Sequence, residues 1–255
     1  MKKQWISVLI LTLLLTACTA QGGEEPAPSR SAQPMEAESS SQLTVAQADY
    51  EIQRLDRSVL EADGAAALEY WYDLVQLTGD RPENEAVNQA IEADSEAFFS
   101  ANGGLEALEE YIQHKPSGNM SYVDCANATI TQNDNGWFSV CMTTEWYMGG
   151  EYNTNLYGMT YNLNTGAAVK LTDLVKEEPE ALSERLHTIV KDYMASQPEA
   201  GWWEDAEQTV DQRPLEEMIF WVDEGEIVLS FYTYELTFGA YGPVIIPTGI
   251  MVEAA

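Results

Sequence analysis

The sequence predicts an α+β fold in which antiparallel β-hairpins pack with a few helices and form two intertwined subdomains. Aromatic and β-branched runs alternate with turn signals such as Asp63-Gly64, a pattern typical of hairpins. Two longer segments carry apolar residues at helical spacing behind a proline. The strand and helix segments are grouped and do not alternate strictly, which favours antiparallel sheets.

The N-terminus has the features of an exported bacterial lipoprotein. Lys2 and Lys3 precede an apolar run that is too short to span a bilayer comfortably, and Leu15-Thr16-Ala17-Cys18 matches a lipobox. We therefore expect residues 1–17 to be a signal peptide and Cys18 to be lipidated. The alternative is an ordinary signal peptide whose cleavage site happens to precede a cysteine. The expected location is the bacterial cell membrane, with the protein anchored through its lipid on the extracytoplasmic face.

Residues 18–48 are rich in small and polar residues and contain hardly a large apolar side chain, so we expect a flexible tether. The N-terminal subdomain is assigned to residues 49–116. Its first part, Tyr50 to Val75, is expected to form two extended segments, the second of which contains the aromatic run Glu69 to Asp73. The Ala65-Ala66-Ala67 run within it suits a helix equally well.

A helix is expected to begin at Pro82, because apolar residues recur at helical spacing from Val87 onward. Gly103-Gly104 interrupts this pattern, and a second helix is expected from Leu105 to His114.

The C-terminal domain is assigned to residues 117–255. A hairpin is expected from Met120 to Tyr147, and a strand pair from Leu156 to Leu171 around Asn164-Thr165-Gly166. A helix should begin after Pro179 and end before Pro198. A last hairpin is expected from Met218 to Val222 and from Ile227 to Leu236, and the segment Tyr241 to Pro247 should close the sheet at an edge, where prolines are tolerated.

Cys125 and Cys141 flank the turn signal Asn133-Asp134-Asn135-Gly136. If the loop is centred near Asn133, the two cysteines face each other across the hairpin. In an extracytoplasmic compartment they would then form a disulfide. The alternative is a pair of buried free thiols.

The formal net charge of −30 excludes nucleic acid and anionic lipid surfaces as partners, because both repel an acidic chain. It would attract cationic proteins. The alternative is that the acidic composition serves only solubility.

Several short motifs resemble the extracellular domain pair of the RsiV family of anti-sigma factors, a pair also found ahead of peptidoglycan deacetylase modules. Tyr161-Asn162-Leu163-Asn164-Thr165-Gly166, followed by Leu171-Thr172-Asp173-Leu174-Val175 and a long helix, is similar to one family motif. Tyr147-Met148-Gly149-Gly150 resembles its Tyr-x-Gly-Gly, and Phe231 to Pro247 is similar to its closing strand. Glu69 to Phe99 is similar to the companion N-terminal domain. The resemblance covers roughly residues 50 to 252.

The sequence departs from that family in two motifs. Glu151-Tyr152-Asn153 stands where the family often has Ala-His-Gly, and Thr248-Gly249-Ile250 follows Pro247 in place of an aromatic and an acidic-Leu pair. The sigma-binding segment and transmembrane helix of the RsiV type are not found in the sequence. The resemblance therefore implies an extracytoplasmic recognition domain without anti-sigma activity.

No catalytic constellation is evident, so we expect a protein that is not an enzyme and has no cofactor. His114 and His187 are far apart and outside any metal-ligand motif, so no metal site is expected. Paired glutamates are too frequent in a chain with 42 acidic residues to indicate a glycosidase centre.

Exposed aromatic residues are the remaining candidates for binding, because such side chains dominate protein- and sugar-binding surfaces. Trp202 and Trp203 follow Gly201 in a loop, while Tyr232 and Tyr234 are expected on one face of a strand. For each residue, packing in the core is the alternative. The candidate binding residues are Gly149, Gly150, Tyr152, Trp202, Trp203, Tyr232, Tyr234 and Tyr241.

Three functional hypotheses follow. The first is a lipid-anchored binding or sensor module for a protein ligand, for which the resemblance suggests a cationic muramidase such as lysozyme. The second is an envelope lipoprotein that binds peptidoglycan strands in an aromatic groove. A purely structural envelope lipoprotein is the third possibility.

Overall fold

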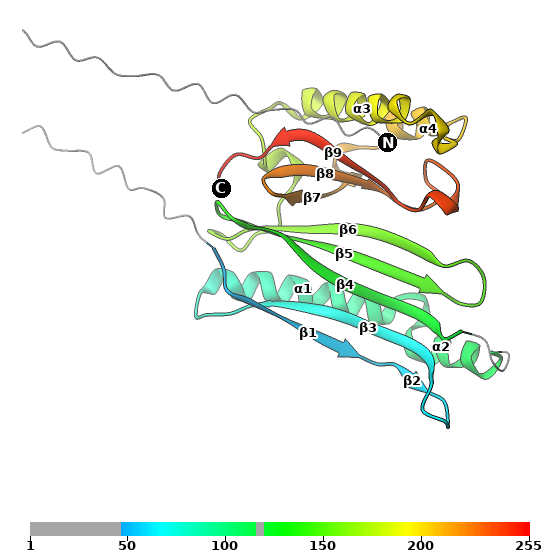
Figure 1. Ribbon diagram of the computed structural model, residues 1–255. Helices are drawn as coiled ribbons and strands as arrows, with labels where there is room; N and C mark the ends of the chain where they lie inside the picture. Colours follow the sequence, from blue (N-terminus) through cyan, green and yellow to red (C-terminus); the bar gives the residue numbers. More distant parts are fainter. Residues whose placement is uncertain (1–46, 116–119) are drawn as a thin grey trace, which may run out of the picture. The chain divides into compact units, whose positions relative to one another are not determined.

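The computed structural model describes residues 47–115 and 120–255. The expected signal peptide (1–17), the lipidated Cys18 and the tether up to residue 46 lie outside these residues. Figure 1 shows the secondary structure. The strands are β1 (Tyr50–Asp56), β2 (Val59–Leu60), β3 (Ala66–Leu77), β4 (Tyr122–Asp134), β5 (Trp137–Tyr147), β6 (Asn153–Asn162), β7 (Ile219–Asp223), β8 (Glu226–Phe231) and β9 (Val244–Met251). The α-helices are α1 (Pro82–Ser100), α2 (Gly104–Gln113), α3 (Pro179–Ser196) and α4 (Ala206–Gln212).

The larger sheet has the strand order β1-β3-β4-β5-β6, and β2 pairs with β3. Its strands are antiparallel except for β3 and β4, which run parallel with Trp71 opposite Cys125. A parallel pair needs a long crossover connection, and α1 and α2 provide it between β3 and β4.

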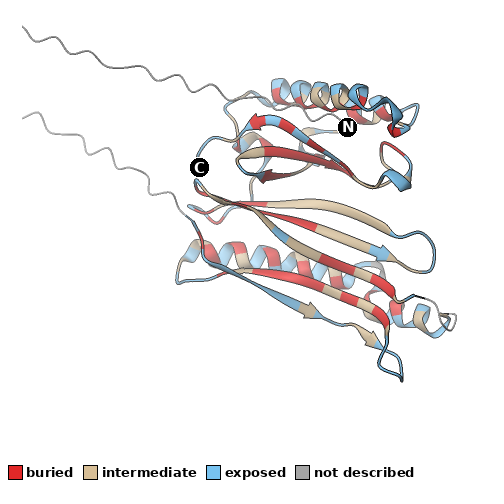
Figure 2. Cartoon of the chain, viewed as in Figure 1, coloured by how far each residue is buried: buried red, intermediate tan, exposed pale blue. Residues whose placement is uncertain are grey.

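Helix α1 packs against this sheet and closes the first hydrophobic core (Figure 2). Pro82 occupies its first turn, where a backbone N–H would have no partner within the helix. The positive end of the helix dipole stabilises the carboxylates of Glu83 and Glu85. Val87 and Ile91 are fully buried at helical spacing. Tyr70 and Tyr72 project from β3 into the same core, and Tyr70 packs edge-on against Phe99 at 5.1 Å between ring centroids.

The second sheet has the order β7-β8-β9, and α3 and α4 share its core. Leu182, Leu186 and Val190 form the fully buried stripe of α3. Pro247 lies on the edge strand β9, as expected.

The two sheets are joined where β7 lies against β4, β5 and β6. The backbone N–H of Val222 donates to Ser139 Oγ at 3.0 Å, and Thr131 Oγ1 donates to the Val222 carbonyl at 2.6 Å. Thr131 lies at an irregularity in the pairing of β4 and β5, between Ile130 and Gln132. Gln132, on its other side, accepts a hydrogen bond from the N–H of Gly225 at 2.7 Å. This irregularity therefore presents side chains that hold the second sheet.

The predicted α+β class is confirmed. Helices begin at Pro82 and Pro179 as the sequence indicated, and the run Glu69 to Asp73 lies in β3. The expectation of a strand pair from Leu156 to Leu171 was wrong in its second half. The segment after β6 forms no second strand, and an isolated bridge joins Tyr161 to Ala168. The last hairpin is also shorter than expected, because β8 ends at Phe231.

The boundary placed between residues 116 and 117 does not separate two cores. The first core draws its residues from Ala48 to Leu163, because β4 completes the sheet that β3 begins. The second core draws on residues 171–255 together with Trp137 of β5. The parallel pairing of β3 and β4 thus unites segments that the sequence analysis assigned to different subdomains.

The structure contradicts the predicted disulfide. Cys125 and Cys141 are free and buried, and Cys125 lies opposite Glu145 while Cys141 lies opposite Thr129. The cysteines are thus four positions out of register, about 14 Å along the strand, whereas a disulfide needs Cα atoms within about 7 Å. The hairpin turns at Asn135-Gly136, which both have positive φ, and the prediction had centred the loop too early, at Asn133.

Candidate interaction surface

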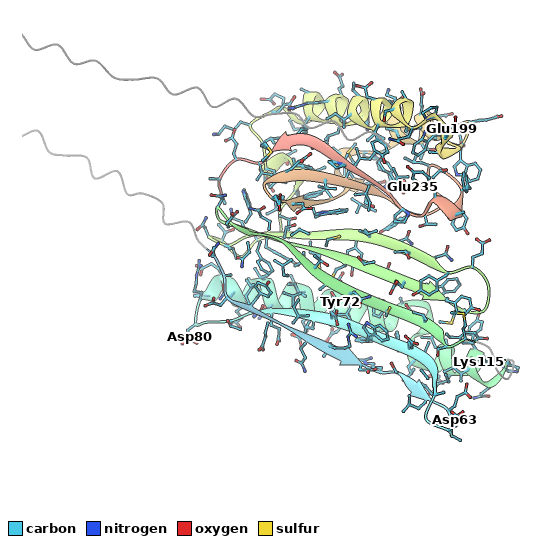
Figure 3. The ribbon with its side chains drawn as sticks, viewed as in Figure 1. Asp63, Tyr72, Asp80, Lys115, Glu199 and Glu235 are labelled. Atoms are coloured by element: carbon cyan, nitrogen blue, oxygen red, sulfur yellow. The ribbon has the colours of Figure 1, made fainter. Side chains whose placement is uncertain are left out.

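Three segments that are distant in sequence meet at one end of the second sheet. They are residues 148–152 between β5 and β6, residues 201–205 before α4, and residues 232–242 between β8 and β9. We call their exposed surface the loop surface. Glu235, on the last of these segments, and Glu199, just before the second, are labelled in Figure 3.

The segment after β8 leaves the sheet in a tight turn instead of continuing it. Tyr234 has φ +72, in the left-handed region. The Glu235 carboxylate accepts a hydrogen bond from the Tyr232 N–H at 2.8 Å and forms an ion pair with Arg213. The expectation that Tyr232 and Tyr234 alternate on one strand face was therefore wrong, because Glu235 folds this segment into a turn.

Thr233 attaches the same turn to the large sheet. Its backbone N–H donates to Asn155 Oδ1 at 2.7 Å, and its hydroxyl donates to the Thr154 carbonyl at 2.5 Å. Both acceptors lie on β6, the edge strand of that sheet. The turn therefore holds Tyr232 and Tyr234 in fixed positions.

Tyr234 connects all three segments. Its hydroxyl donates to the Glu151 carboxylate of the first segment, and its backbone carbonyl accepts the indole N–H of Trp203 at 3.2 Å. The hydrogen bond to Glu151 raises the pKa of Tyr234. A Cβ atom on Gly239 would lie 2.1 Å from the Tyr234 ring, so the chain can pass beneath this ring only because residue 239 is glycine.

Five aromatic side chains of the loop surface are more than 40% exposed: Tyr152 (47%), Trp203 (43%), Tyr232 (43%), Tyr234 (48%) and Phe238 (42%). Tyr152 stacks on Tyr147 with 6.1 Å between ring centroids. Burial, and secondarily Glu145, raises the pKa of Tyr152 to about 12, so its phenol stays protonated at neutral pH. These rings expose apolar area next to carboxylates.

Trp202 has a structural role that its neighbour lacks. Its indole N–H donates to the carbonyls of Met194 and Gln197, both at 2.9 Å, at the C-terminal end of α3. Its ring packs between Tyr193 and Tyr241, with centroids 6.4 and 5.7 Å away. Trp202 therefore fastens its segment to the end of α3, and of the two tryptophans Trp203 is the one available to a partner.

The other predicted site residues surround this centre. Gly149 and Gly150 are exposed in the first segment, and Gly149 adopts a positive φ beside the Tyr122 ring. Tyr232 is 43% exposed. Glu151 and Phe238 were not among the predicted site residues. Phe238 could have been found from the sequence because it stands in a turn-rich segment, but the role of Glu151 depends on its contact with Tyr234.

A second polar cluster lies between α1 and the large sheet. Asp94 of α1 accepts hydrogen bonds from Tyr72 at 2.7 Å and from Tyr157 at 2.6 Å. Figure 3 labels Tyr72. Burial is the main cause that raises the pKa of both phenols, so neither is a base at neutral pH. The cluster fastens β3 and β6 to the helix.

The histidines take part in backbone contacts. His114 Nδ1 lies 2.8 Å from the Glu110 carbonyl, and His187 Nε2 lies 3.1 Å from the Arg213 carbonyl. Within residues 47–115 and 120–255, no group of three or more His, Cys, Asp or Glu side chains is arranged to hold a metal ion. In the same ranges no helix has the length and apolarity needed to cross a membrane.

Two solved structures share this fold. A member of the DUF3298 family from Bacteroides fragilis has a TM-score of 0.55 and 17% identity, covering 78% of this chain and 89% of its own. A DUF3298 family protein from Pseudomonas aeruginosa PAO1 has a TM-score of 0.54 and 12% identity, covering 80% of this chain and 91% of its own. No family model and no curated protein matches the sequence. At these identities the comparison shows a common fold.

Proposed function

We propose that this chain is a lipid-anchored extracytoplasmic binding module whose loop surface recognises a cationic protein. The observation that carries the proposal is the exposed aromatic group Tyr152, Trp203, Tyr234 and Phe238, held in place next to Glu151. Interface hot spots are enriched in tryptophan and tyrosine, because a rigid ring buries a large area at a small entropy cost.

Charge determines the class of partner. The chain carries 42 acidic and 12 basic side chains, so its field attracts a basic protein and repels an acidic one. The resemblance of Tyr147-Met148-Gly149-Gly150 to an RsiV motif supports the same region, because this motif leads directly into Glu151 and Tyr152. A cationic muramidase such as lysozyme is the first ligand to test.

The binding test is a titration of the mature chain with hen egg-white lysozyme at about 20 and 150 mM salt. We expect tighter binding at low salt, where the Debye length is longer. Trp203→Ala and Tyr234→Ala should each weaken binding by about tenfold or more, as hot-spot truncations do.

Tyr50→Ala is the matched control, because Tyr50 is 42% exposed on β1 and outside the loop surface. It should leave the affinity unchanged. The proposal fails if lysozyme does not bind at low salt, or if the control loses as much affinity as the two test variants. Binding of muropeptides that resists salt and requires Trp203 would assign the same surface to cell-wall glycan.

The anchor is tested separately. We expect Cys18→Ala to move the protein from the membrane fraction to the soluble fraction, because one lipidated thiol would carry the whole attachment. Recovery of Cys18→Ala protein in washed membranes would show that the signal peptide remains uncleaved as an anchor, and it would leave the binding proposal standing.

A further inference from the structure

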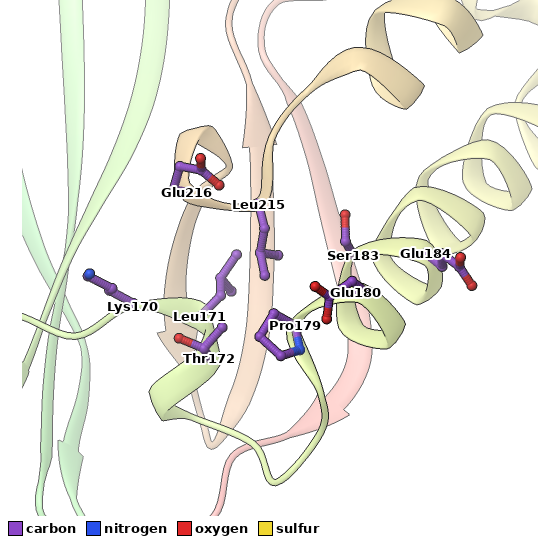
Figure 4. Close-up of a pocket in the computed structure, with 9 residues that line it drawn as sticks. All are labelled: Lys170, Leu171, Thr172, Pro179, Glu180, Ser183, Glu184, Leu215 and Glu216. Atoms are coloured by element: carbon purple, nitrogen blue, oxygen red, sulfur yellow. The ribbon is translucent and has the colours of Figure 1, made fainter.

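An open groove lies at the N-terminal end of α3, at the other end of this helix from the Gly201–Asp205 segment. It is formed by the 3-10 turn Leu171–Asp173, the first turn of α3 and the 3-10 turn Leu215–Glu217, and it has a volume of about 500 Å³ (Figure 4). We call it the α3 groove. Its lining residues are Lys170, Leu171, Thr172, Pro179, Glu180, Ser183, Glu184, Leu215 and Glu216.

The floor of the groove is apolar. Leu171, Pro179 and Leu215 converge there from three separate segments (Figure 4). Leu171 and Leu215 also pack against the second core, which fixes their positions. The 3-10 turn that carries Leu171 is closed by a hydrogen bond from the Lys170 N–H to Asp173 Oδ2 at 2.8 Å. The floor is thus built into the fold.

The rim of the groove is acidic. Glu180, Glu184 and Glu216 line it, and Lys170 is the single basic residue of the lining. Within the described parts of the chain, none of these three glutamates takes part in an ion pair. Glu180 and Glu184 are four positions apart on one helix, a spacing at which like charges repel. A cation bound between them would relieve that repulsion.

We propose that the α3 groove binds a lysine side chain of a basic peptide segment. The aliphatic stem lies on Leu171, Pro179 and Leu215, and the ammonium group reaches the rim carboxylates. Lysine side chains are amphipathic in this way, with an apolar stem and a charged head. The volume of about 500 Å³ also admits the neighbouring residues of the peptide.

The geometry favours lysine over arginine. The rim carboxylates are spread over α3 and the turn Leu215–Glu217. A compact ammonium with rotatable donors matches such a scattered set better than a planar guanidinium does. The lining also contains no aromatic ring on which a guanidinium would stack.

This site is separate from the loop surface. Helix α3 has 18 residues, so its ends lie about 27 Å apart. The groove is at its first turn, and the segment with Trp203 follows its last turn.

The test is a calorimetric titration of the mature chain with tetralysine at about 20 mM salt, where screening is weak. Glu180→Gln/Glu184→Gln should weaken binding about threefold to tenfold, within the range for the loss of two exposed ion pairs. The matched control is Glu106→Gln/Glu110→Gln, which removes two exposed acids at the same spacing on α2. This control changes the net charge by the same amount but lies outside the α3 groove. It should therefore change the affinity for tetralysine by less than twofold.

A second variant blocks the groove without changing charge. Ser183→Phe places a ring in the groove and should also weaken binding, whereas Thr188→Phe, on an exposed position of the same helix, should not. Equal effects of either test variant and its control would overturn the proposal. Loss of tetralysine binding in Trp203→Ala would also overturn it, by assigning the peptide to the loop surface. Failure of lysozyme to bind the loop surface would not affect the conclusion about tetralysine binding in the α3 groove.

Discussion

The two buried cysteines show how the environment of a residue decides its chemistry. Cys125 and Cys141 are 0% and 5% exposed, and burial raises the pKa of each thiol to about 12. Because the thiolate is the reactive form, both should be inert in the folded protein.

We therefore expect a thiol reagent at pH 8 to label neither cysteine in the native protein and both after denaturation. Reducing agent should leave the melting temperature unchanged. Absence of reactive Cys125 and Cys141 in denatured, unreduced protein would contradict the free thiols and restore the disulfide.

Asp124 gives a prediction about pH. Burial raises the pKa of its carboxyl to about 6, above the ordinary value of 3.8. The folded state therefore holds this proton more tightly than the unfolded state. Above pH 6 the buried carboxylate is charged, and this lowers the free energy of unfolding. The loss of stability disappears as the pH falls through about 6 toward 4 and the carboxyl becomes protonated.

Asp124→Asn should consequently raise the free energy of unfolding by about 1–3 kcal/mol at pH 7 and change it little at pH 4. Urea titrations of both proteins at the two pH values measure this difference. A variant that is destabilised at pH 7, or stabilised equally at both values, would show that the Asp124 charge is compensated in the fold.

At the scale of the elements, one close approach between the sheets depends on a glycine. A Cβ atom on Gly158 of β6 would lie 1.9 Å from the Phe220 carbonyl oxygen and 2.7 Å from Trp221 Cβ on β7. Because both obstacles belong to a strand fixed by its own sheet, the sheets would have to move apart.

Gly158→Ala should lower the free energy of unfolding by about 1–3 kcal/mol or more, as overpacking does. Gly150→Ala is the control, because a Cβ there meets nothing within 4 Å. Thermal melts of the two variants provide the comparison. Equal melting temperatures would mean that β6 and β7 are less closely packed than the structure has them.

At the scale of the whole described molecule, the two cores are tied together. Trp137 lies on β5 of the large sheet, yet its side chain packs in the second core and its indole N–H donates to the Glu253 carbonyl at 2.6 Å. A buried hydrogen bond also joins Ser139 to Val222, and a partly buried one joins Thr131 to Val222.

We expect this coupling to make unfolding a single cooperative transition. Urea curves followed by far-UV circular dichroism and by tryptophan fluorescence should coincide. Two separated transitions would show that residues 171–255 unfold independently of the larger sheet.

The sequence by itself determined the local geometry of the chain. Pro82 and Pro179 begin helices because their fixed φ suits a first turn, and Asn135-Gly136 turns the β4–β5 hairpin because both residues accept positive φ. Helix α4 escaped the sequence analysis because its seven residues bury only Ala206 and Val210, too few to establish a period.

The tertiary structure alone decided which distant segments meet. The parallel pairing of β3 with β4 arises from the burial they share with α1, and it moved the boundary between the cores. The turn at Tyr234 depends on Glu235 and on acceptors of β6, some 80 residues earlier in the chain. Burial and hydrogen bonding over such separations leave no periodic trace in the sequence. The aromatic residues of the loop surface were therefore recognisable one by one, and only the fold brought them together.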